Sequence, residues 1–442
     1  MRKAMDACQS LLTPRGNAGA LATSACVHLL DELKYSEAST TSTLKERRSK
    51  VLAKWKDEQK DDCLETIHHD VNEESSPLTT WYFRQHFHQN NQPCRIHGLK
   101  ESCFRRVNVI WNSPQTFRHW MRHVFSPRDD EMSSHLPVRR GGTHEATLDD
   151  DGRATECTTI NMPLEEWITY LDCEHVKDSN NKNKDYLKDF HLEAILEEHK
   201  LLDSELYQVP DVFGHDLLNP FLRAFTKGDY RFVYWGPPGS RTDWHSDVLN
   251  SFSWSYNVFG CKEWTFQVPQ SNLHFKIVQN AGECIFVPAT WKHEVVNLEE
   301  TLSINRNWLT ASNLDLCWTC LTTEIRSIEN ELDSWGADYD WEARESMLRG
   351  CVGLDVTAFY LLILYHLATI QKDDTPESGG RSLFDPDAAF EVHQCAGTLR
   401  TLLDDESLHL EERLAATLVS RDLAQKVQRL GRLVCQEIPI SS

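Results

Sequence analysis

The chain has 442 residues, 40% of them hydrophobic, and a formal net charge of −21. This length leaves room for one core domain and a second module, at roughly 100–200 residues per domain. The negative charge argues against direct binding to nucleic acid, because affinity for a phosphate backbone depends on Lys and Arg side chains that neutralise it.

The N-terminal part differs in composition from the rest of the chain. Residues 35–62 are rich in Ser, Thr, Lys, Glu and Asp and poor in aromatics. Residues 1–76 are therefore predicted to form a poorly ordered or helical N-terminal extension. Since no secretory segment is convincing, we expect a cytoplasmic protein, with the nucleus as the alternative. Polar, turn-rich stretches at 141–152, 177–184 and 372–382 are predicted to be long surface loops.

Short strands separated by turns predict a mainly β core. Runs rich in β-branched and aromatic residues lie at 230–235, 252–259, 263–268, 284–287, 294–298 and 302–308. Turn signals between them include Gly236-Pro237-Pro238-Gly239, Gly260, Pro269-Gln270-Ser271 and Ala281-Gly282-Glu283. Strands at such spacing are typical of an antiparallel sandwich or barrel.

After the last of these strands the hydrophobic pattern changes to a helical period. Leu314, Leu316, Cys317, Leu321, Ile325 and Ile328 form one apolar stripe, and residues 356–370 form a second apolar helix. This second helix is shorter than the roughly 20 residues of a membrane span, so no membrane is expected. Residues 399–433 add two amphipathic helical segments. Residues 316–442 are thus predicted to be a C-terminal helical module, packed on the core or on a second subunit as a homodimer.

The cysteines do not predict a zinc finger. Of the 14 cysteines, Cys317 and Cys320 form the one CxxC pair, which lies in a predicted helix, and no second pair stands at finger spacing. We expect these thiols to be reduced and mostly packed.

Two histidines and one aspartate form a candidate metal site. His245 and Asp247 are two residues apart, so in an extended strand their side chains point to the same face. His293 must then arrive from a neighbouring strand. Two imidazoles and one carboxylate are the ligand set of non-haem Fe(II) oxygenases, which leaves three coordination positions open. The alternative interpretation is that these histidines are ordinary polar residues at strand ends.

Four strings around this triplet are similar to those of a known family. They are Tyr186-Leu187-Lys188-Asp189-Phe190-His191, Tyr230-Arg231-Phe232-Val233-Tyr234, Ser251-Phe252-Ser253-Trp254-Ser255 and Ser303-Ile304-Asn305. With them, the chain resembles the JmjC-type Fe(II)- and 2-oxoglutarate-dependent dioxygenases, and within these the JmjC-domain-containing protein 4 group. The resemblance covers about residues 77–315 and is densest over 230–308. It implies a double-stranded β-helix, a jelly-roll or cupin-like JmjC barrel with flanking helices.

The same resemblance implies residues that hold the co-substrate 2-oxoglutarate beside Fe(II) and dioxygen. Lys262 matches the cation for the far carboxylate, a role that a lysine can fill as a point charge. Thr242 and Tyr186 match hydroxyl donors to the same carboxylate, and Asn307 matches a polar residue near the end that chelates iron. Without the resemblance, we would interpret Lys262 as a solvated turn residue. Tyr186 and Asn307 would be interpreted as ordinary surface or core-edge groups.

Two positions depart from the wider family. Ser255 stands where many JmjC hydroxylases have Asn, and Asn305 stands where several have Thr. We interpret both as features of the protein 4 group. Asn257 lies two residues after Ser255, on the same strand face, and is the candidate to compensate.

The implied reaction is hydroxylation of a protein side chain, with 2-oxoglutarate converted to succinate. The protein 4 group is associated with lysyl hydroxylation of a translation termination factor, release factor 1, so the resemblance implies this protein substrate; an acidic enzyme also suits a basic side chain. One alternative is a JmjC N-methyl-lysine demethylase acting on histones or other proteins, although no chromatin-reading module or zinc cluster is recognisable. Another is a non-catalytic barrel that serves as an interaction protein.

Overall fold

The computed structural model describes residues 70–72, 79–125, 135–141, 159–173, 176, 184–201, 205–226, 228–335, 339–373, 386–418 and 421–438. The predictions for residues 1–69 and for most of the three predicted loops lie outside these ranges. Asp70–Asn72, which we assigned to the N-terminal extension, form a strand at the edge of the main sheet.

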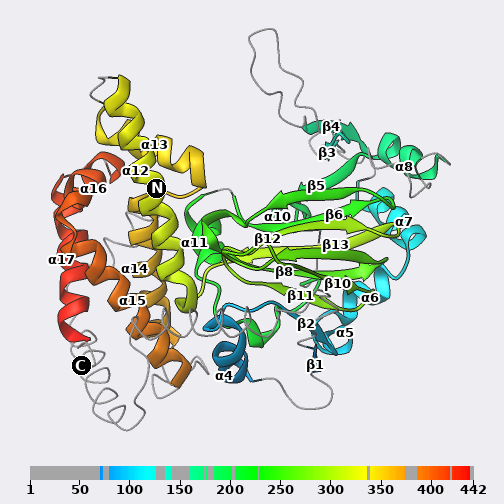
Figure 1. Ribbon diagram of the computed structural model, residues 1–442, viewed down its shortest axis with the longest axis horizontal. Coiled ribbons are helices and arrows are strands. Elements are labelled where there is room, and N and C mark those ends of the chain that lie inside the picture. Colours follow the sequence, from blue (N-terminus) through cyan, green and yellow to red (C-terminus); the bar gives the residue numbers. More distant parts are fainter. Residues whose placement is uncertain are drawn as a thin grey trace.

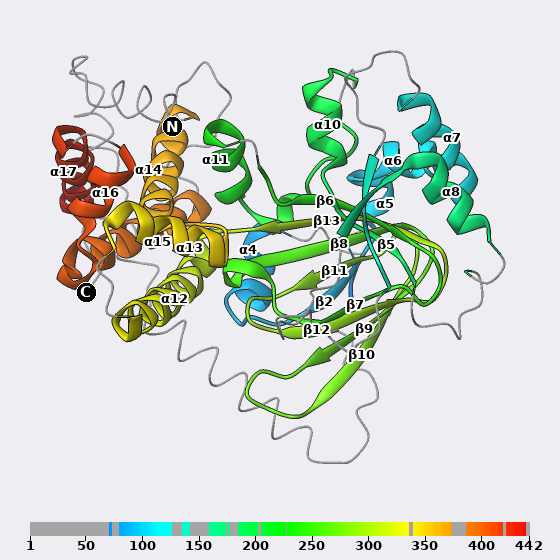
Figure 2. The same cartoon turned by 90° about the horizontal axis from the view of Figure 1, so that it is seen from above.

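Two β-sheets face each other and form the barrel (Figures 1 and 2). The large sheet has nine strands in the order β1-β2-β11-β8-β13-β6-β5-β3-β4, and the small sheet has four in the order β10-β9-β12-β7. All their pairings are antiparallel except that of β1 with β2. This arrangement confirms the predicted mainly β, jelly-roll core.

The bounds of the strands are as follows. The large sheet contains β1 (Asp70–Asn72), β2 (Cys94–His97), β3 (His135–Arg139), β4 (Thr159–Pro163), β5 (Tyr186–Phe190), β6 (Arg231–Gly236), β8 (Phe252–Phe259), β11 (Cys284–Val287) and β13 (Thr301–Trp308). The small sheet contains β7 (Arg241–His245), β9 (Lys262–Gln267), β10 (His274–Gln279) and β12 (Lys292–Asn297). All six predicted strands are present. Beyond them, the structure has β1 to β5, β7 and β10, which lie outside these six runs; of these, extended backbone was expected only around His245 at the end of β7.

Side chains alternate between the two faces of the large sheet. Trp254 and Tyr256 of β8, with Ile304 of β13, belong to a hydrophobic core under the helices that cover the outer face. The alternate residues of these strands are polar and buried, and they face the barrel interior: Ser253, Ser255, Asn257, Ser303, Asn305 and Asn307. Burying so many polar groups is costly unless they are hydrogen-bonded, which marks this interior as more than packing.

Short helices cover the outer face of the large sheet (Figure 2). They are α4 (Thr80–Phe83), the π-helical turn η2 (Arg84–His88), α5 (Leu99–Ser102), α6 (Arg105–Ile110), α7 (Pro114–Val124), α8 (Leu164–Asp172) and α10 (Leu192–Glu198). Helix α11 (Leu218–Phe225) instead packs its apolar residues into the core of the C-terminal helices. Helix α7 begins at a capping box in which Ser113 and Thr116 satisfy each other's backbone N–H groups. It buries Phe117 edge-on against Trp235 of β6, with ring centres 4.9 Å apart.

The C-terminal part is a helical module with its own hydrophobic core. It contains α12 (Leu314–Trp335), α13 (Trp341–Val352), α14 (Val356–Asp373), α15 (Pro386–Asp404), α16 (Leu410–Leu418) and α17 (Arg421–Glu437). The two predicted apolar helices correspond to α12 and α14. The stretch 399–433, predicted as two segments, holds the end of α15, all of α16 and most of α17. Helix α13 was not predicted.

Within the described residues, no single helix combines the length and apolar composition of a membrane span; α13 and the first part of α14 reach both only as a pair bent by 75°. The cysteines in the described ranges are free, including Cys317 and Cys320 on α12.

Candidate metal centre

His245, Asp247 and His293 meet at one end of the barrel interior. One nitrogen of each histidine and one carboxylate oxygen all lie within 4.8 Å of one another. His293 on β12 is paired directly with His245, the last residue of β7, and the ring centres are 4.2 Å apart. The structure therefore brings together the three side chains that the sequence predicted as metal ligands, with His293 on the strand beside His245 as expected.

Both histidine rings point their Nδ1 atom toward a backbone carbonyl oxygen. Nδ1 of His245 lies 2.8 Å from the carbonyl oxygen of Asp243, and Nδ1 of His293 lies 3.0 Å from that of Trp291. A carbonyl can only accept, so each Nδ1 carries the proton and each Nε2 keeps its lone pair for a metal. Burial lowers the pKa of His293 to about 4, so this imidazole is neutral at physiological pH.

Asp247 is oriented by Ser253. Asp247 lies two residues beyond β7 with extended backbone angles, φ −63° and ψ 145°, so it stays on the same side as His245. The hydroxyl of Ser253 on β8 donates to Oδ2 of Asp247 at 2.6 Å. A hydrogen bond from the opposite sheet fixes the carboxylate, as is typical of metal-binding aspartates.

A β-bulge in β7 turns Thr242 toward the same interior. The pairing of β12 with β7 passes from His293–His245 to Val295–Thr242, so two steps on β12 match three on β7. Without this extra residue, Thr242 and His245 would point to opposite faces, because their spacing is odd. The structure therefore places Thr242 on the metal-binding face.

Lys262 points into the barrel and is almost completely buried. It is the first residue of β9, only 1% exposed, and its Nζ donates to Ser303 Oγ at 2.6 Å. Burial and the nearby charge of Lys188 lower the pKa of Lys262 to about 7. No carboxylate of the described residues forms an ion pair with Lys262, which is unusual for a buried ammonium in a structural role and suits an anionic ligand.

Tyr186 and Asn307 also lie at this interior. Tyr186 begins β5, is 3% exposed, and burial raises its pKa well above the ordinary value. Asn307 on β13 is paired with Ser253, the residue that holds Asp247, and donates to Ser251 Oγ at 3.1 Å. Neither is a surface residue, in contrast to the alternative interpretation from the sequence.

Several polar atoms in the interior lack a hydrogen-bond partner. Ser255 Oγ, Asn257 Oδ1 and Asn297 Oδ1 are buried and unsatisfied. Ser255 lies across from Asn305 in the pairing of β8 with β13, and Asn297 lies across from Lys262 in the pairing of β12 with β9. Unsatisfied buried atoms are rare in a packed core. Together with Lys262 they fit a polar ligand beside the metal ligands.

The sequence analysis missed Lys188 as a site residue. Lys188 is 7% exposed, and its Nζ lies 5.5 Å from the ring centre of Tyr234. The Nζ of Lys262 lies 5.8 Å from the centre of the same ring. Strand alternation could have revealed it, because Lys188 follows Tyr186 by two residues on β5. The interior therefore holds a second lysine near Lys262.

Chemically, the residues fit a divalent metal and an anionic chelator. Three ligands from one side leave open positions on the ion, and two lysines with hydroxyl and amide groups face the space next to them.

Comparisons with known proteins agree with this geometry. The JmjC domain (hydroxylase) profile matches residues 273–308, which include His293 and Asn307. The 2-oxoglutarate and iron-dependent oxygenase JMJD4 of Danio rerio is 29% identical over 62% of this chain and 75% of its own length. JMJD4 of Gallus gallus is 34% identical over 45% of this chain and 54% of its own length. The arginine-specific demethylase JMJ20 of Arabidopsis thaliana is 31% identical over 64% of this chain and 66% of its own length.

Proposed function

We propose that this chain is a dioxygenase that hydroxylates a lysine of a protein substrate, release factor 1. The proposal is supported by the match of residues 273–308 to the JmjC domain and by the similarity to the 2-oxoglutarate and iron-dependent oxygenases named JMJD4. The observation that carries the proposal is the facing pair of imidazoles with Asp247 beside them, both Nε2 atoms kept unprotonated. This donor set is that of the non-haem Fe(II) oxygenases.

In this proposal each interior residue has a role. His245, Asp247 and His293 would hold Fe(II), which would supply the oxidising chemistry. Lys262 binds the far carboxylate of 2-oxoglutarate, and Thr242 and Tyr186 add hydrogen bonds to it. Asn307 lies beside Ser253 and supports the metal end. The aromatic rings of Trp264 and Phe266 pack at 5.6 and 5.7 Å from the His293 ring and keep bulk water from that side.

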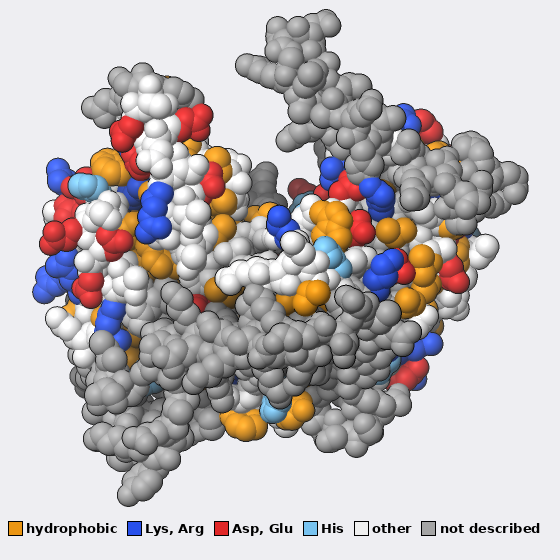
Figure 3. All heavy atoms as spheres, viewed as in Figure 1, with side chains coloured by type: hydrophobic (Ala, Val, Ile, Leu, Met, Phe, Trp, Pro, Cys, Tyr) orange, Lys and Arg blue, Asp and Glu red, His pale blue; other side chains and the backbone are white. Residues whose placement is uncertain are grey.

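A basic substrate side chain is supported by charge. The chain carries a net charge of −21, and its exposed Asp189 stands next to the interior residue Lys188, where it accepts a hydrogen bond of 2.8 Å from Tyr234. On the face shown in Figure 3, acidic and basic side chains of the described residues are interspersed, without one continuous basic patch. Such a surface favours a cationic peptide over a phosphate backbone.

The test is turnover of release factor 1 by the purified full chain with Fe(II), 2-oxoglutarate and oxygen. We expect succinate release matched by a gain of one oxygen atom on a single lysine, seen by peptide mass spectrometry, and no product with Asp247→Ala. Succinate formed without any modified lysine would exclude this substrate. No succinate formation with any protein of a cell extract would exclude the dioxygenase itself.

A second candidate is protein demethylation, favoured by the plant relative that is named an arginine-specific demethylase. Hydroxylation of an N-methyl carbon gives an unstable product that releases formaldehyde, whereas hydroxylation within a lysine side chain gives a stable one. Formaldehyde released from methylated arginine or lysine peptides, without a stable mass gain, would support this candidate over lysyl hydroxylation.

A further inference from the structure

A second group of metal-ligating side chains lies between the barrel and the helical module. It consists of His215, His366 and Glu391, here called the interface triad, whose ligand atoms all lie within 4.8 Å of one another. His215 comes from the loop before α11, His366 from α14 and Glu391 from α15. None of these elements contributes to the His245 site, so the interface triad is a separate feature.

The three side chains converge on one carboxylate oxygen. Nδ1 of His215 lies 2.6 Å from Oε2 of Glu391, and Nε2 of His366 lies 3.2 Å from the same atom. Two ligands at about 2.0–2.2 Å from a tetrahedral zinc ion are about 3.4 Å apart, so inserting the ion requires outward shifts below about 1 Å. The donor atoms are thus already gathered around a common point.

Two members of the interface triad are buried, and the third is partly exposed. The Glu391 side chain is 9% exposed and that of His366 is 8%, whereas His215 is 39% exposed. In the described part of the chain, the two histidines are the ion-pair partners of Glu391. A divalent cation can bind this carboxylate and a nitrogen of each histidine at the same time.

We propose that His215, His366 and Glu391 bind a zinc ion that fastens the helical module to the barrel. Two imidazoles and one carboxylate form a known zinc ligand set, and the partial exposure of His215 leaves a fourth position that water can reach. The zinc ion joins three segments that are far apart in sequence.

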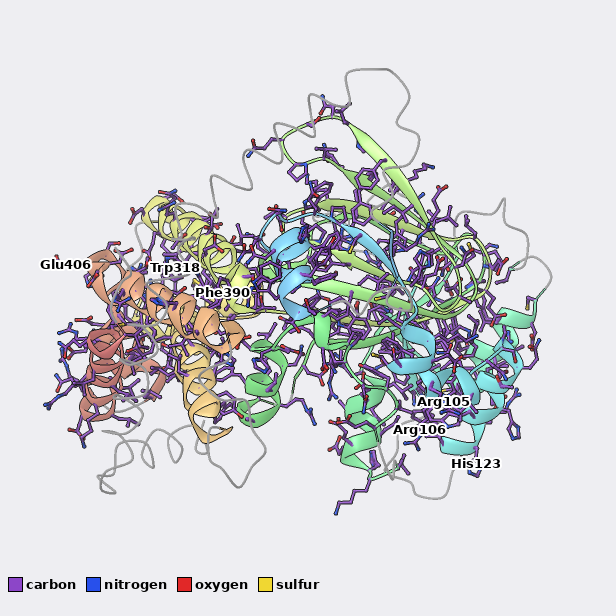
Figure 4. The ribbon with its side chains drawn as sticks, turned by 90° about the horizontal axis from the view of Figure 1, so that it is seen from below. Arg105, Arg106, His123, Trp318, Phe390 and Glu406 are labelled. Atoms are coloured by element: carbon purple, nitrogen blue, oxygen red, sulfur yellow. The ribbon has the colours of Figure 1, made fainter. Side chains whose placement is uncertain are left out.

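The surroundings of the interface triad fit a structural role. The loop of His215 is anchored to the barrel, because Leu217 N–H donates to the carbonyl of Leu309 at 2.8 Å. Phe390, next to Glu391, lies where α15 faces α4 in Figure 4, and the guanidinium of Arg84 lies 4.4 Å from its ring centre. The zinc ion would therefore add to an existing contact between the two parts of the chain.

The experiment uses the full chain with His245→Ala and Asp247→Ala, so that the first metal site cannot contribute. After dialysis against a chelator, this parent protein is titrated with zinc chloride, and bound zinc is counted by elemental mass spectrometry. We expect one zinc ion per chain and a rise in thermal unfolding temperature. Adding Glu391→Gln should weaken zinc binding more than tenfold, since losing even an outer-shell partner costs roughly 10- to 100-fold.

Glu406→Gln is the matched control, because Glu406 is an exposed glutamate elsewhere on the helical module (Figure 4). It should leave zinc binding unchanged. Equal zinc binding by the parent and its Glu391→Gln derivative would overturn the proposal. If that derivative fails to fold, the test is the rate at which diethyl pyrocarbonate modifies His215 in the parent protein. Zinc should slow this modification, and an unchanged rate would overturn the proposal.

Discussion

Lys262 on β9 donates a hydrogen bond of 2.6 Å to Ser303 on β13, and this contact joins the small sheet to the large sheet across the barrel interior. The ammonium is 1% exposed, and its ring neighbour is Tyr234, with the Nζ 5.8 Å from the ring centre. A hydroxyl is a weak partner for a buried cation, so we propose that an anion, the far carboxylate of 2-oxoglutarate, completes the arrangement.

Replacing Lys262 by Met should weaken 2-oxoglutarate binding about 10- to 100-fold, because a hydrogen bond to a charged group contributes roughly 1.5–3 kcal/mol. Isothermal titration of the Mn(II)-loaded protein measures this directly. Lys276→Met is the control, since Lys276 on β10 is 61% exposed and pairs with Glu263 at the surface. A Lys262→Met protein that binds 2-oxoglutarate as tightly as the unmodified chain would remove Lys262 from the site.

The affinity for 2-oxoglutarate should fall as the pH rises above 7. Without ligand, burial and the charge of Lys188 lower the pKa of Lys262 to about 7, so at higher pH the side chain is neutral. A bound dianion raises this pKa, and binding therefore takes up a proton. Titrations in two buffers of different ionisation enthalpy measure the proton uptake. Equal affinity at pH 6.5 and pH 8.5, or equal proton uptake by Lys262→Met, would contradict the prediction.

The same shift links Lys262 to stability. The folded pKa lies below the ordinary value of 10.5, so between about pH 7 and 10.5 the unfolded chain binds the proton more readily. For the ligand-free protein, the contribution of Lys262 should therefore increase the free energy of unfolding as the pH rises from about 7 to 10.5, and decrease it as the pH falls back toward 7.

Ser253→Ala should lower metal affinity about 10- to 100-fold while leaving the three metal ligands in place. The reason is the 2.6 Å hydrogen bond from Ser253 Oγ that orients Asp247, and outer-shell partners of metal ligands typically have effects of this size. Mn(II) titration followed by electron paramagnetic resonance gives the affinity. Ser246→Ala is the control, because Ser246 lies between the two ligands in sequence but is exposed. Equal losses in both variants would point to the loop and not to the hydrogen bond.

Lys188→Met should have two effects that a merely structural role would not produce together. Removing one of two interior cations should weaken 2-oxoglutarate binding by about 1–2 kcal/mol. It should also move the pH midpoint of binding upward, because the charge of Lys188 is one of the causes that lower the pKa of Lys262. Lys188→Arg keeps the charge and should keep the midpoint. A weaker affinity with an unmoved midpoint would mean that Lys188 acts through packing alone.

Local sequence pattern predicted the centre of the barrel well. The runs 252–259 and 284–287 match β8 and β11 at both ends. In β8, aromatic and apolar residues alternate with Ser253, Ser255 and Asn257, which is the period of a strand, whereas β11 is continuously apolar. Strand β10, His274–Gln279, escaped notice because it is exposed on alternate residues and shows only Phe275, Ile277 and Val278 as apolar side chains.

Other features depend on contacts that sequence spacing does not encode. The odd spacing of Thr242 and His245 would separate their side chains in a regular strand, and only the bulge opposite His293 and Val295 reunites them. The interface triad brings Glu391 onto residues 215 and 366 through the packing of the helical module. Neither the bulge nor this packing follows from local periodicity.

Gly236 shows how tightly the co-substrate end of the barrel is packed. A Cβ at this position of β6 would lie 2.4 Å from Ser240 Oγ and 2.4 Å from Cδ2 of Tyr186. Neither neighbour moves easily, since Ser240 is held by Asn297 at 2.8 Å and Tyr186 is buried in the interior. A methyl group here therefore pushes on a predicted 2-oxoglutarate ligand.

Gly236→Ala should lower the free energy of unfolding by about 1–3 kcal/mol, the usual cost of overpacking, and should raise the KM for 2-oxoglutarate because Tyr186 is displaced. Gly350→Ala is the control: it lies in α13 with no atom within 4 Å of the added Cβ, so helix propensity alone should raise stability by up to about 1 kcal/mol. Denaturant titrations and initial rates measure both quantities. If Gly236→Ala lowered stability but left the KM for 2-oxoglutarate unchanged, the Tyr186 hydroxyl would not bind the co-substrate. Lower stability together with a higher KM would support binding of the far carboxylate by Tyr186 and Lys262.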